Sequence, residues 1–174
     1  MNKELIDIAI ERLSYQLIEK HNKFESSILI GLQPRGAFLC KRVLKKLNFL
    51  LPTIDIKSGN LDISFYRDDL MRRDHPIEPD IMDINLSFED KNIILVDDVL
   101  FTGRSIRSAL DAILAFGRPK TVELLTLINR RFSRHLPIEP TYVGKTIDAL
   151  SEEKVIVEWK EVHGVDRVLM KKNT

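Results

Sequence analysis

Residues 92–106, NIILVDDVLFTGRSI, constrain the fold of this chain more than any other stretch. Four aliphatic residues, Ile93 to Val96, lead directly into two adjacent carboxylates, Asp97 and Asp98. A short polar loop follows, and a helical pattern begins after it. A strand, a turn and a helix N-terminus in immediate succession present main-chain N–H groups and hydroxyls to an anion. The stretch therefore predicts an α/β fold whose ligand carries a phosphate, with carboxylates alongside to bind a ribose diol.

The rest of the chain alternates helix and strand patterns, which is typical of a mainly parallel sheet covered by helices on both faces. Apolar periodicity predicts helices over residues 3–19, 37–47 and 103–116, and apolar runs predict strands over residues 27–32, 61–66, 93–96, 122–128, 142–143 and 155–159. Gly117 and Pro119 end the third helix. Since ligands in such folds bind at the carboxyl ends of the strands, we expect the turns at 33–36 and 97–105 to face one crevice.

Residues 67–90 form a long, charged segment that Pro76 and Pro79 interrupt. Such a segment exceeds routine connections, and long loops are often lids or binding loops. We favour a flexible loop that closes over the site, with a disordered insertion as the alternative. The 174 residues are expected to form a single domain, 1–174.

Composition excludes several classes of protein. Lys and Arg number 27 against 26 acids, so no global charge draws the chain to nucleic acid or membrane. The single Cys40 excludes an intramolecular disulfide and a cysteine zinc site, and its apolar neighbours indicate a buried thiol. No apolar run approaches the ~20 residues of a membrane helix, and the amphipathic N-terminus is unlike a secretory signal. We expect a cytoplasmic protein without membrane contact.

The candidate site residues can be interpreted by their chemistry. Asp97 and Asp98 can accept hydrogen bonds from both ribose hydroxyls, and they can hold Mg²⁺ directly or through water. Gly103 allows close backbone approach, while Thr102 and Ser105 add hydroxyl donors. Neither a P-loop nor a dinucleotide fingerprint is present. A second turn, with Arg35 beside Gly36, is interpreted as a donor to a further anionic group rather than as plain surface.

The stretch ILVDDVLFTGRS resembles the phosphoribosyl-pyrophosphate signature of type I phosphoribosyltransferases. Three further runs, DISFYRDDL, VDDVLFTGRSIRSALDAILAFGRPK and LPIEPTYVGK, are similar to the bifunctional pyrimidine attenuation regulator and uracil phosphoribosyltransferase family, the PyrR type. The resemblance extends over roughly residues 4–159. It implies the type I phosphoribosyltransferase fold: a mainly parallel twisted sheet flanked by helices, a small hood near residues 129–160, and a flexible active-site loop.

The resemblance also implies roles for individual residues. Asp97 and Asp98 would contact the ribose hydroxyls and the Mg²⁺ shell, and Arg35 with Gly36 would bind pyrophosphate. The base would sit under a hood around Arg130. The 5′-phosphate loop and the hood segment near residues 141–143 would contribute the remaining substrate contacts, namely Phe101, Thr102, Gly103, Arg104, Ser105, Tyr142 and Val143.

One position and three departures bear on specificity. Enzymes for 6-oxopurines carry an acid where this chain has Phe101, so the resemblance disfavours a purine substrate. Pro34 replaces a threonine that many members have before the Arg-Gly pair. The run at 129–137 is longer than usual and lacks an aspartate, which leaves base recognition open. Asp148 is a weak candidate for a metal-contacting acid.

Two functions from different classes therefore remain. The first is an enzyme that makes UMP and pyrophosphate from uracil and phosphoribosyl pyrophosphate, and a purine enzyme is its less favoured variant. The second is a UMP-sensing regulator that binds an mRNA stem-loop and whose catalysis is vestigial. The family resemblance implies a homodimer or higher homo-oligomer. The candidate basic residues for RNA are Lys41, Arg42, Lys45, Lys46, Arg130, Arg131 and Arg134, and for those on the second helix a solvated helix face is slightly favoured.

Overall fold

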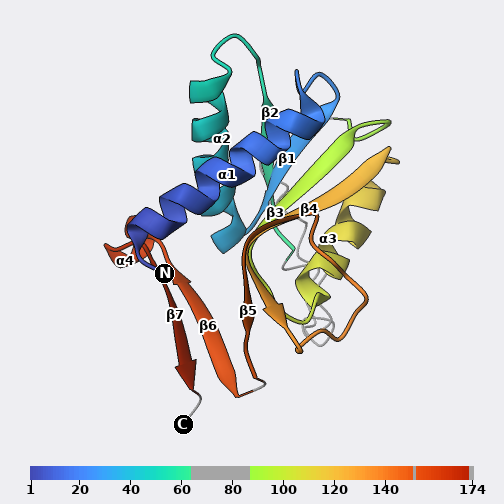
Figure 1. Ribbon diagram of the computed structural model, residues 1–174. Coiled ribbons are helices and arrows are strands. Elements are labelled where there is room, and N and C mark those ends of the chain that lie inside the picture. Colours follow the sequence, from blue (N-terminus) through green and yellow to red (C-terminus); the bar gives the residue numbers. More distant parts are fainter. Residues whose placement is uncertain (64–86, 151, 173–174) are drawn as a thin grey trace.

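The computed structural model describes residues 1–63, 87–150 and 152–172. Its centre is a parallel sheet in which every neighbouring pair of strands runs in the same direction. The strands are β1 (Ser27–Leu32), β2 (Lys57–Leu61), β3 (Asn92–Leu100), β4 (Thr121–Arg131) and β5 (Tyr142–Asp148), and their order is β2-β1-β3-β4-β5 (Figure 1). The carboxyl ends of the two longest strands, β3 and β4, therefore lie side by side in the middle of the sheet.

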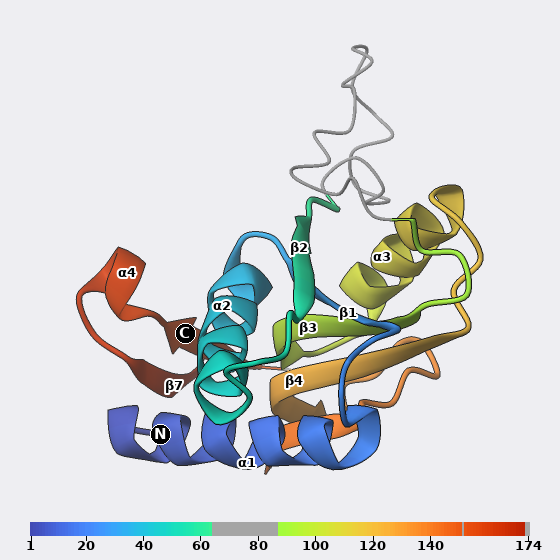
Figure 2. The ribbon, with the colours of Figure 1, turned by 90° about the horizontal axis from the view of Figure 1, so that it is seen from above.

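Helices cover both faces of this sheet (Figure 2). Helices α1 (Lys3–His21) and α2 (Arg35–Leu50) pack on one face, and α3 (Arg104–Ala115) packs on the other. Each face has its own buried apolar cluster, one built mainly on α1 and α2 and one on α3. Because side chains alternate along each strand, both clusters draw on the same strands.

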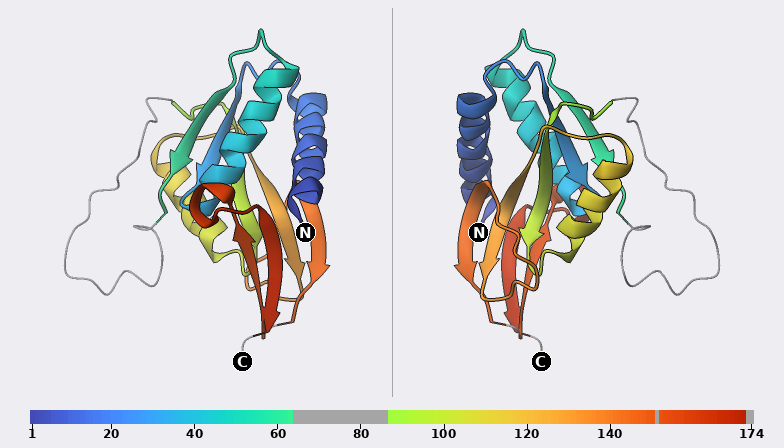
Figure 3. Two further views of the ribbon diagram at one scale, coloured as in Figure 1. Left: turned by 90° about the vertical axis from the view of Figure 1, so that its left-hand side faces the viewer. Right: turned by 90° about the vertical axis from the view of Figure 1, so that its right-hand side faces the viewer.

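A two-stranded antiparallel hairpin follows the sheet. Strands β6 (Glu153–Glu158) and β7 (Arg167–Lys172) flank the short helix α4 (Lys160–His163). The hairpin extends from the end of the sheet at which β4 and β5 finish (Figure 3). The N-terminus is joined to it, because the Met1 ammonium group donates to the Val168 carbonyl oxygen at 2.8 Å.

The structure confirms the α/β fold class and the helices predicted from apolar periodicity, with shifted ends. Helix α2 continues to Leu50 rather than ending at residue 47, and α3 is one residue shorter than predicted at each end. Helix α1 is two residues longer, and α2 begins at Arg35 rather than at residue 37. Arg35 and Gly36 thus belong to the first turn of a helix, not to a free turn. The left-handed Gly117 follows the end of α3, as expected for a helix terminus.

The strand predictions need larger corrections. The strand expected over residues 61–66 is instead β2, which ends at Leu61, and residues 64–66 lie outside the described ranges. β3 does not end before Asp97 but continues to Leu100, because its ladder with β4 continues past the carboxylates. β4 and β5 are likewise longer than predicted, and β7 was not predicted.

Most of the predicted closing loop, residues 67–86, lies outside the described residues. Its expected end is described: Phe88 is fully buried beside α3 and meets the Phe116 ring edge-on. Within the described residues, no helix has both the length and the apolar character that spanning a membrane requires.

Candidate active site

Asp97 and Asp98 lie near the carboxyl end of β3, still within the strand. Asp98 is only 7% exposed, and its main-chain N–H donates to Oδ1 of Asp97 at 3.0 Å. The second carboxylate oxygen of Asp98, Oδ2, is buried and accepts no hydrogen bond within the part of the chain that the structure describes. Since buried polar atoms are normally paired, this oxygen is available to a ligand.

Burial makes both carboxyl groups weaker acids than exposed aspartates. Burial, followed by the neighbouring charge of Asp98, raises the pKa of Asp97 to about 8. Burial also raises the pKa of Asp98, to about 6, although the positive charge of Arg35 opposes the shift. Two adjacent acids that resist ionisation attract a cation, because positive charge offsets both the desolvation and the repulsion.

Asp97 and Asp98 suit Mg²⁺, which takes part of its ligands from water and substrate, better than a metal whose ligands all come from the protein. The described residues contain no group of three or more His, Cys, Asp or Glu side chains that could enclose a metal. Mg²⁺ commonly binds one or two carboxylates and completes its octahedron with water and substrate phosphates. Asp97 and Asp98 can supply that protein share.

Gly36 determines how closely α2 approaches these acids. A Cβ built on Gly36 would lie 2.3 Å from the carbonyl oxygen of Val96 and 3.0 Å from the Cα of Asp97. Only glycine allows this contact, so the first turn of α2 lies directly against β3. The neighbouring Arg35 is exposed, and its charge partly opposes the burial that raises the pKa of both Asp97 and Asp98. The structure thus brings Arg35 and Gly36 to the predicted carboxylates.

The loop after β3 leads into α3 through Gly103. This glycine has a φ of +89°, in the left-handed region, and it is the N-cap of the helix. It has no side chain that could cap the helix, and the Arg104 N–H donates instead to Oγ1 of Thr102 at 3.4 Å. Ser105 lies in the first turn of α3. The loop therefore has the form of a helix N-terminus that accepts an anion.

Phe101 and Arg130 meet beside this loop. The Arg130 guanidinium lies over the Phe101 ring, 4.0 Å from the centroid, and Arg130 also donates to the Leu150 carbonyl oxygen at 3.1 Å. Arg130 is buried, whereas Phe101 is 40% exposed. The two predicted base contacts are therefore neighbours in the structure, and Phe101 presents an apolar ring to solvent.

The remaining predicted residues have other partners. The Tyr142 hydroxyl donates to Glu123 at 2.6 Å, within a network that includes His21 on the α1 face of the sheet. Its neighbour Val143 pairs with Thr126 of β4, and its carbonyl oxygen accepts from Arg12. Asp148, the weak metal candidate, accepts two hydrogen bonds from Arg131, at 2.6 and 2.8 Å.

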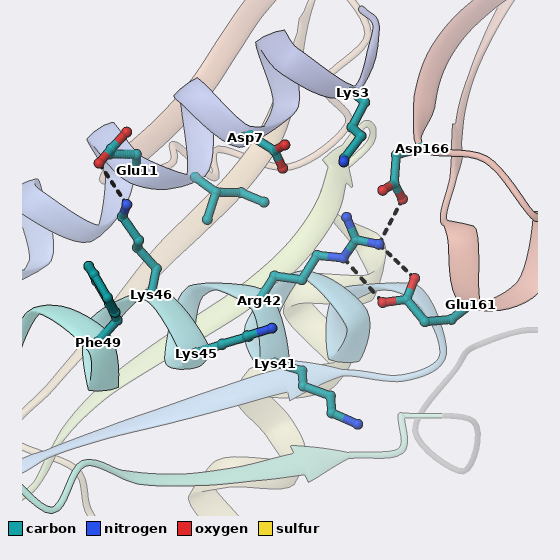
Figure 4. Close-up of a pocket in the computed structure, with 11 residues that line it drawn as sticks. Lys3, Asp7, Glu11, Lys41, Arg42, Lys45, Lys46, Phe49, Glu161 and Asp166 are labelled. Atoms are coloured by element: carbon teal, nitrogen blue, oxygen red, sulfur yellow. Dashed lines mark hydrogen bonds and ion pairs between the residues drawn. The ribbon is translucent and has the colours of Figure 1, made fainter. Parts of the chain in front are cut away.

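Most of the candidate basic residues for RNA are engaged inside the chain. Arg42 pairs with both Glu161 and Asp166 at 2.7 Å, and Lys46 pairs with Glu11 at 2.6 Å. These pairs line a hollow of about 710 Å³ between α1, α2 and the segment around α4 (Figure 4). The hollow contains none of the predicted substrate residues, and most of its charges are paired. Lys41 and Lys45, also on its rim, are exposed.

One contact beside the loop at 101–103 had no signal in the sequence. The segment after β4 lies against the loop at 101–103, with Arg134 donating to the Phe101 carbonyl oxygen and to Oδ1 of Asn129. The main-chain N–H groups of His135 and Leu136 donate to the Thr102 carbonyl oxygen. The two segments are about thirty residues apart in the chain, so no local pattern could indicate the contact.

Comparison with known proteins agrees with this geometry. The family model described as the phosphoribosyl transferase domain matches residues 2–161. The bifunctional protein pyrR of Enterococcus faecalis is 41% identical over 175 residues, which cover 98% of this chain and 97% of that protein. The bifunctional protein PyrR of Streptococcus suis is 39% identical over 173 residues, which cover 97% of this chain and 96% of that protein.

Solved structures share the fold at lower identity. The hypoxanthine phosphoribosyltransferase of Trypanosoma cruzi has a TM-score of 0.74 and 14% identity, and the match covers 99% of this chain and 94% of that one. A hypoxanthine phosphoribosyltransferase of Staphylococcus aureus has a TM-score of 0.68 and 21% identity, with 92% and 84% covered. At such identities the likeness establishes the fold alone. From the family match and the full-length similarity together, the chain belongs to the phosphoribosyltransferase family and, within it, to the PyrR group.

Proposed function

We propose that the protein makes UMP and pyrophosphate from uracil and phosphoribosyl pyrophosphate. The observation that carries the proposal is the junction of β3 with α3. Two adjacent acids, one with a buried oxygen that has no hydrogen-bond partner among the described residues, precede an αL glycine that opens a helix. The first turn of α2, with Arg35, approaches the same acids through Gly36. This arrangement offers separate groups for a diol, a phosphate and a second anion.

Different residues of the site bind different parts of the substrate. Asp97 and Asp98 bind the ribose hydroxyls and orient the ring, and Thr102 to Ser105 bind the 5′-phosphate at the start of α3. Arg35 stabilises the charge that develops on pyrophosphate as it leaves C1 of the ribose. When it is bound with the substrate, Mg²⁺ supplies further positive charge to that leaving group. The reaction has oxocarbenium character and needs no side-chain nucleophile.

The base is expected beside Phe101. An aromatic ring cannot exchange a proton with a purine nitrogen, so the position favours a pyrimidine. Arg130 holds the ring in place through their cation–π contact. The names of the similar proteins, which describe them as bifunctional PyrR, agree with this choice.

A second activity of the same protein is regulatory. We propose that UMP in this site adjusts binding to an mRNA stem-loop, since the PyrR relatives are named bifunctional. A sensor of UMP requires the same 5′-phosphate loop and diol acids as the enzyme. Exposed cations for RNA remain on α2, where Lys41 and Lys45 reach solvent.

The proposal includes a homodimer or larger homo-oligomer in the cytoplasm. The outer side of α1 exposes Leu5, Ile8 and Tyr15, which lie along one stripe of the helix. A second copy of the chain is the expected partner of that stripe. The one cysteine, Cys40, is buried as a free thiol, which suits a reducing compartment.

Calorimetric titration tests the site. Wild-type protein should bind UMP and magnesium phosphoribosyl pyrophosphate, and the double variant Asp97→Asn with Asp98→Asn should lose productive binding of the latter. The amides keep the shape of the carboxylates but lose their charge. An unchanged affinity for magnesium phosphoribosyl pyrophosphate in the folded double variant would remove the assignment of these acids.

A further inference from the structure

Arg134 bridges two parts of the structure that the chain sequence separates. Its guanidinium donates to the carbonyl oxygen of Phe101 and, at 2.6 Å, to Oδ1 of Asn129. Asn129 belongs to β4, which pairs with β3 up to Leu100. Arg134 therefore connects the end of the central sheet with the first residue of the phosphate loop.

The two residues after Arg134 bind the peptide group between Thr102 and Gly103. The His135 N–H donates to the Thr102 carbonyl oxygen at 3.0 Å, and the Leu136 N–H donates to the same oxygen at 3.2 Å. Gly103 packs against the side of this segment, since a Cβ built there would lie 3.2 Å from Ile138 and 3.5 Å from Leu136. Ile138 in turn packs on the buried cluster beneath α3. The segment at 134–138 is therefore held in place by its own packing against this cluster.

These contacts determine which way the amide groups of the loop face. A trans peptide is planar, with its C=O and N–H on opposite sides. When the Phe101 carbonyl points to Arg134, the N–H of Thr102 points away from that segment. When the Thr102 carbonyl points to His135 and Leu136, the N–H of Gly103 also points away. Neither N–H donates to another described residue, so both remain free for an anion.

We propose that Arg134 is a positioning residue for the 5′-phosphate loop. It fixes the peptide planes at 101–103, so that consecutive N–H groups face the phosphate, without touching the substrate itself. The inference rests on the proposed function, in which this loop binds the 5′-phosphate of both UMP and phosphoribosyl pyrophosphate. It gives the segment after β4 a role distinct from base recognition.

Arg134→Ala tests the inference by ligand choice. UMP carries a 5′-phosphate, whereas magnesium pyrophosphate does not and uses the Arg35 side of the site. Calorimetry on the variant should show UMP affinity reduced about 10- to 100-fold, the range for loss of a charged hydrogen bond. Affinity for magnesium pyrophosphate should stay near the wild-type value. In steady-state kinetics the KM for phosphoribosyl pyrophosphate should rise more than kcat falls.

The control is Arg107→Ala, which removes an exposed arginine of α3 that pairs only with Asp111 among the described residues. It should bind both ligands like the wild type. If Arg134→Ala unfolds, Arg134→Gln, which keeps a donor and most of the side-chain packing, takes its place with a smaller UMP-selective loss. Unchanged UMP affinity, or equal losses for UMP and pyrophosphate, would overturn the positioning role. Failure of the wild type to bind UMP would instead count against the proposed function.

Discussion

The guanidinium carbon of Arg130 lies 4.0 Å from the centroid of the Phe101 ring. Arg130 comes from β4, and Phe101 is the first residue after β3. A hydrogen bond from Arg130 to the Leu150 carbonyl oxygen adds the segment between β5 and β6 to the same contact. One buried cation therefore holds together the three segments around the expected base position.

A double-mutant cycle measures that contact. Arg130→Met keeps most of the packing but loses the charge, and Phe101→Leu removes the aromatic face. We expect Arg130→Met to lower the free energy of unfolding by about 1–3 kcal/mol, because it removes a charged hydrogen bond as well as the cation–π contact. The coupling between the two substitutions should be about 0.5–2 kcal/mol in urea denaturation. Strict additivity would mean that the ring and the guanidinium do not interact.

Gly36→Ala tests the close approach of α2 to β3. The added Cβ would overlap the Val96 carbonyl oxygen, which is main chain and cannot rotate away. We expect a loss of about 1–3 kcal/mol of unfolding free energy, as for other overpacked sites, together with weaker binding of phosphoribosyl pyrophosphate. Lys41→Ala, at an exposed position of the same helix, is the control and should stay within about 0.5 kcal/mol of the wild type. Wild-type stability and affinity in Gly36→Ala would show that α2 is not seated against the acids.

The acids make stability depend on pH in a defined direction. In the fold the pKa of Asp97 is raised to about 8 and that of Asp98 to about 6, from 3.8 for both in the unfolded chain. Below the unfolded pKa both groups are protonated in either state, so they cost nothing. As the pH rises toward 8, the unfolded state ionises freely and the folded state does not, so stability is lost.

The double variant Asp97→Asn with Asp98→Asn should therefore be more stable than the ligand-free wild type, and its advantage should grow with pH. Urea denaturation at pH about 5 and about 8.5 measures the difference. The amide oxygen introduced by Asp97→Asn can still accept the hydrogen bond from the next main-chain N–H, so the fold is retained. An advantage that shrinks on going to the higher pH would contradict the burial of these charges.

Substitutions at Arg35 and in the phosphate loop should affect the affinities for different ligands. Arg35→Ala should weaken phosphoribosyl pyrophosphate binding by about 1.5–3 kcal/mol, the range for hydrogen bonds to charged groups, and leave UMP affinity nearly unchanged. Thr102→Ala with Ser105→Ala should weaken both ligands, because both carry the 5′-phosphate. Titration calorimetry on the two variants decides. Equal losses for UMP and phosphoribosyl pyrophosphate in Arg35→Ala would mean that the start of α2 is not a pyrophosphate site.

Local patterns predicted the elements whose own residues determine them. Apolar periodicity locates α1 and α3, because each helix buries one face. β2 escaped prediction because it is an edge strand with a polar sequence, KSGNL, held by pairing with β1. β7 escaped for a similar reason: most of its residues are exposed, half of them are charged, and β6 supplies the pairing.

The site shows the same division. The placement of Asp97, Asp98 and Gly103 between a strand and a helix was predictable from their order in the chain, because strand, acids and helix start are contiguous. The extension of β3 through the acids was not, since the ladder with β4 is a long-range contact that does not depend on side-chain polarity. Nor was the engagement of Arg131 with Asp148 or of Tyr142 with Glu123, whose partners become neighbours only across the sheet.

A base-conversion assay with radiolabelled uracil, hypoxanthine, guanine and orotate tests the central claim most directly. With magnesium phosphoribosyl pyrophosphate present, uracil should be converted to UMP, and the two purines should not, because Phe101 stands where purine enzymes have an acid. Preferential conversion of hypoxanthine or guanine would contradict the account, and so would binding of UMP without conversion of any base.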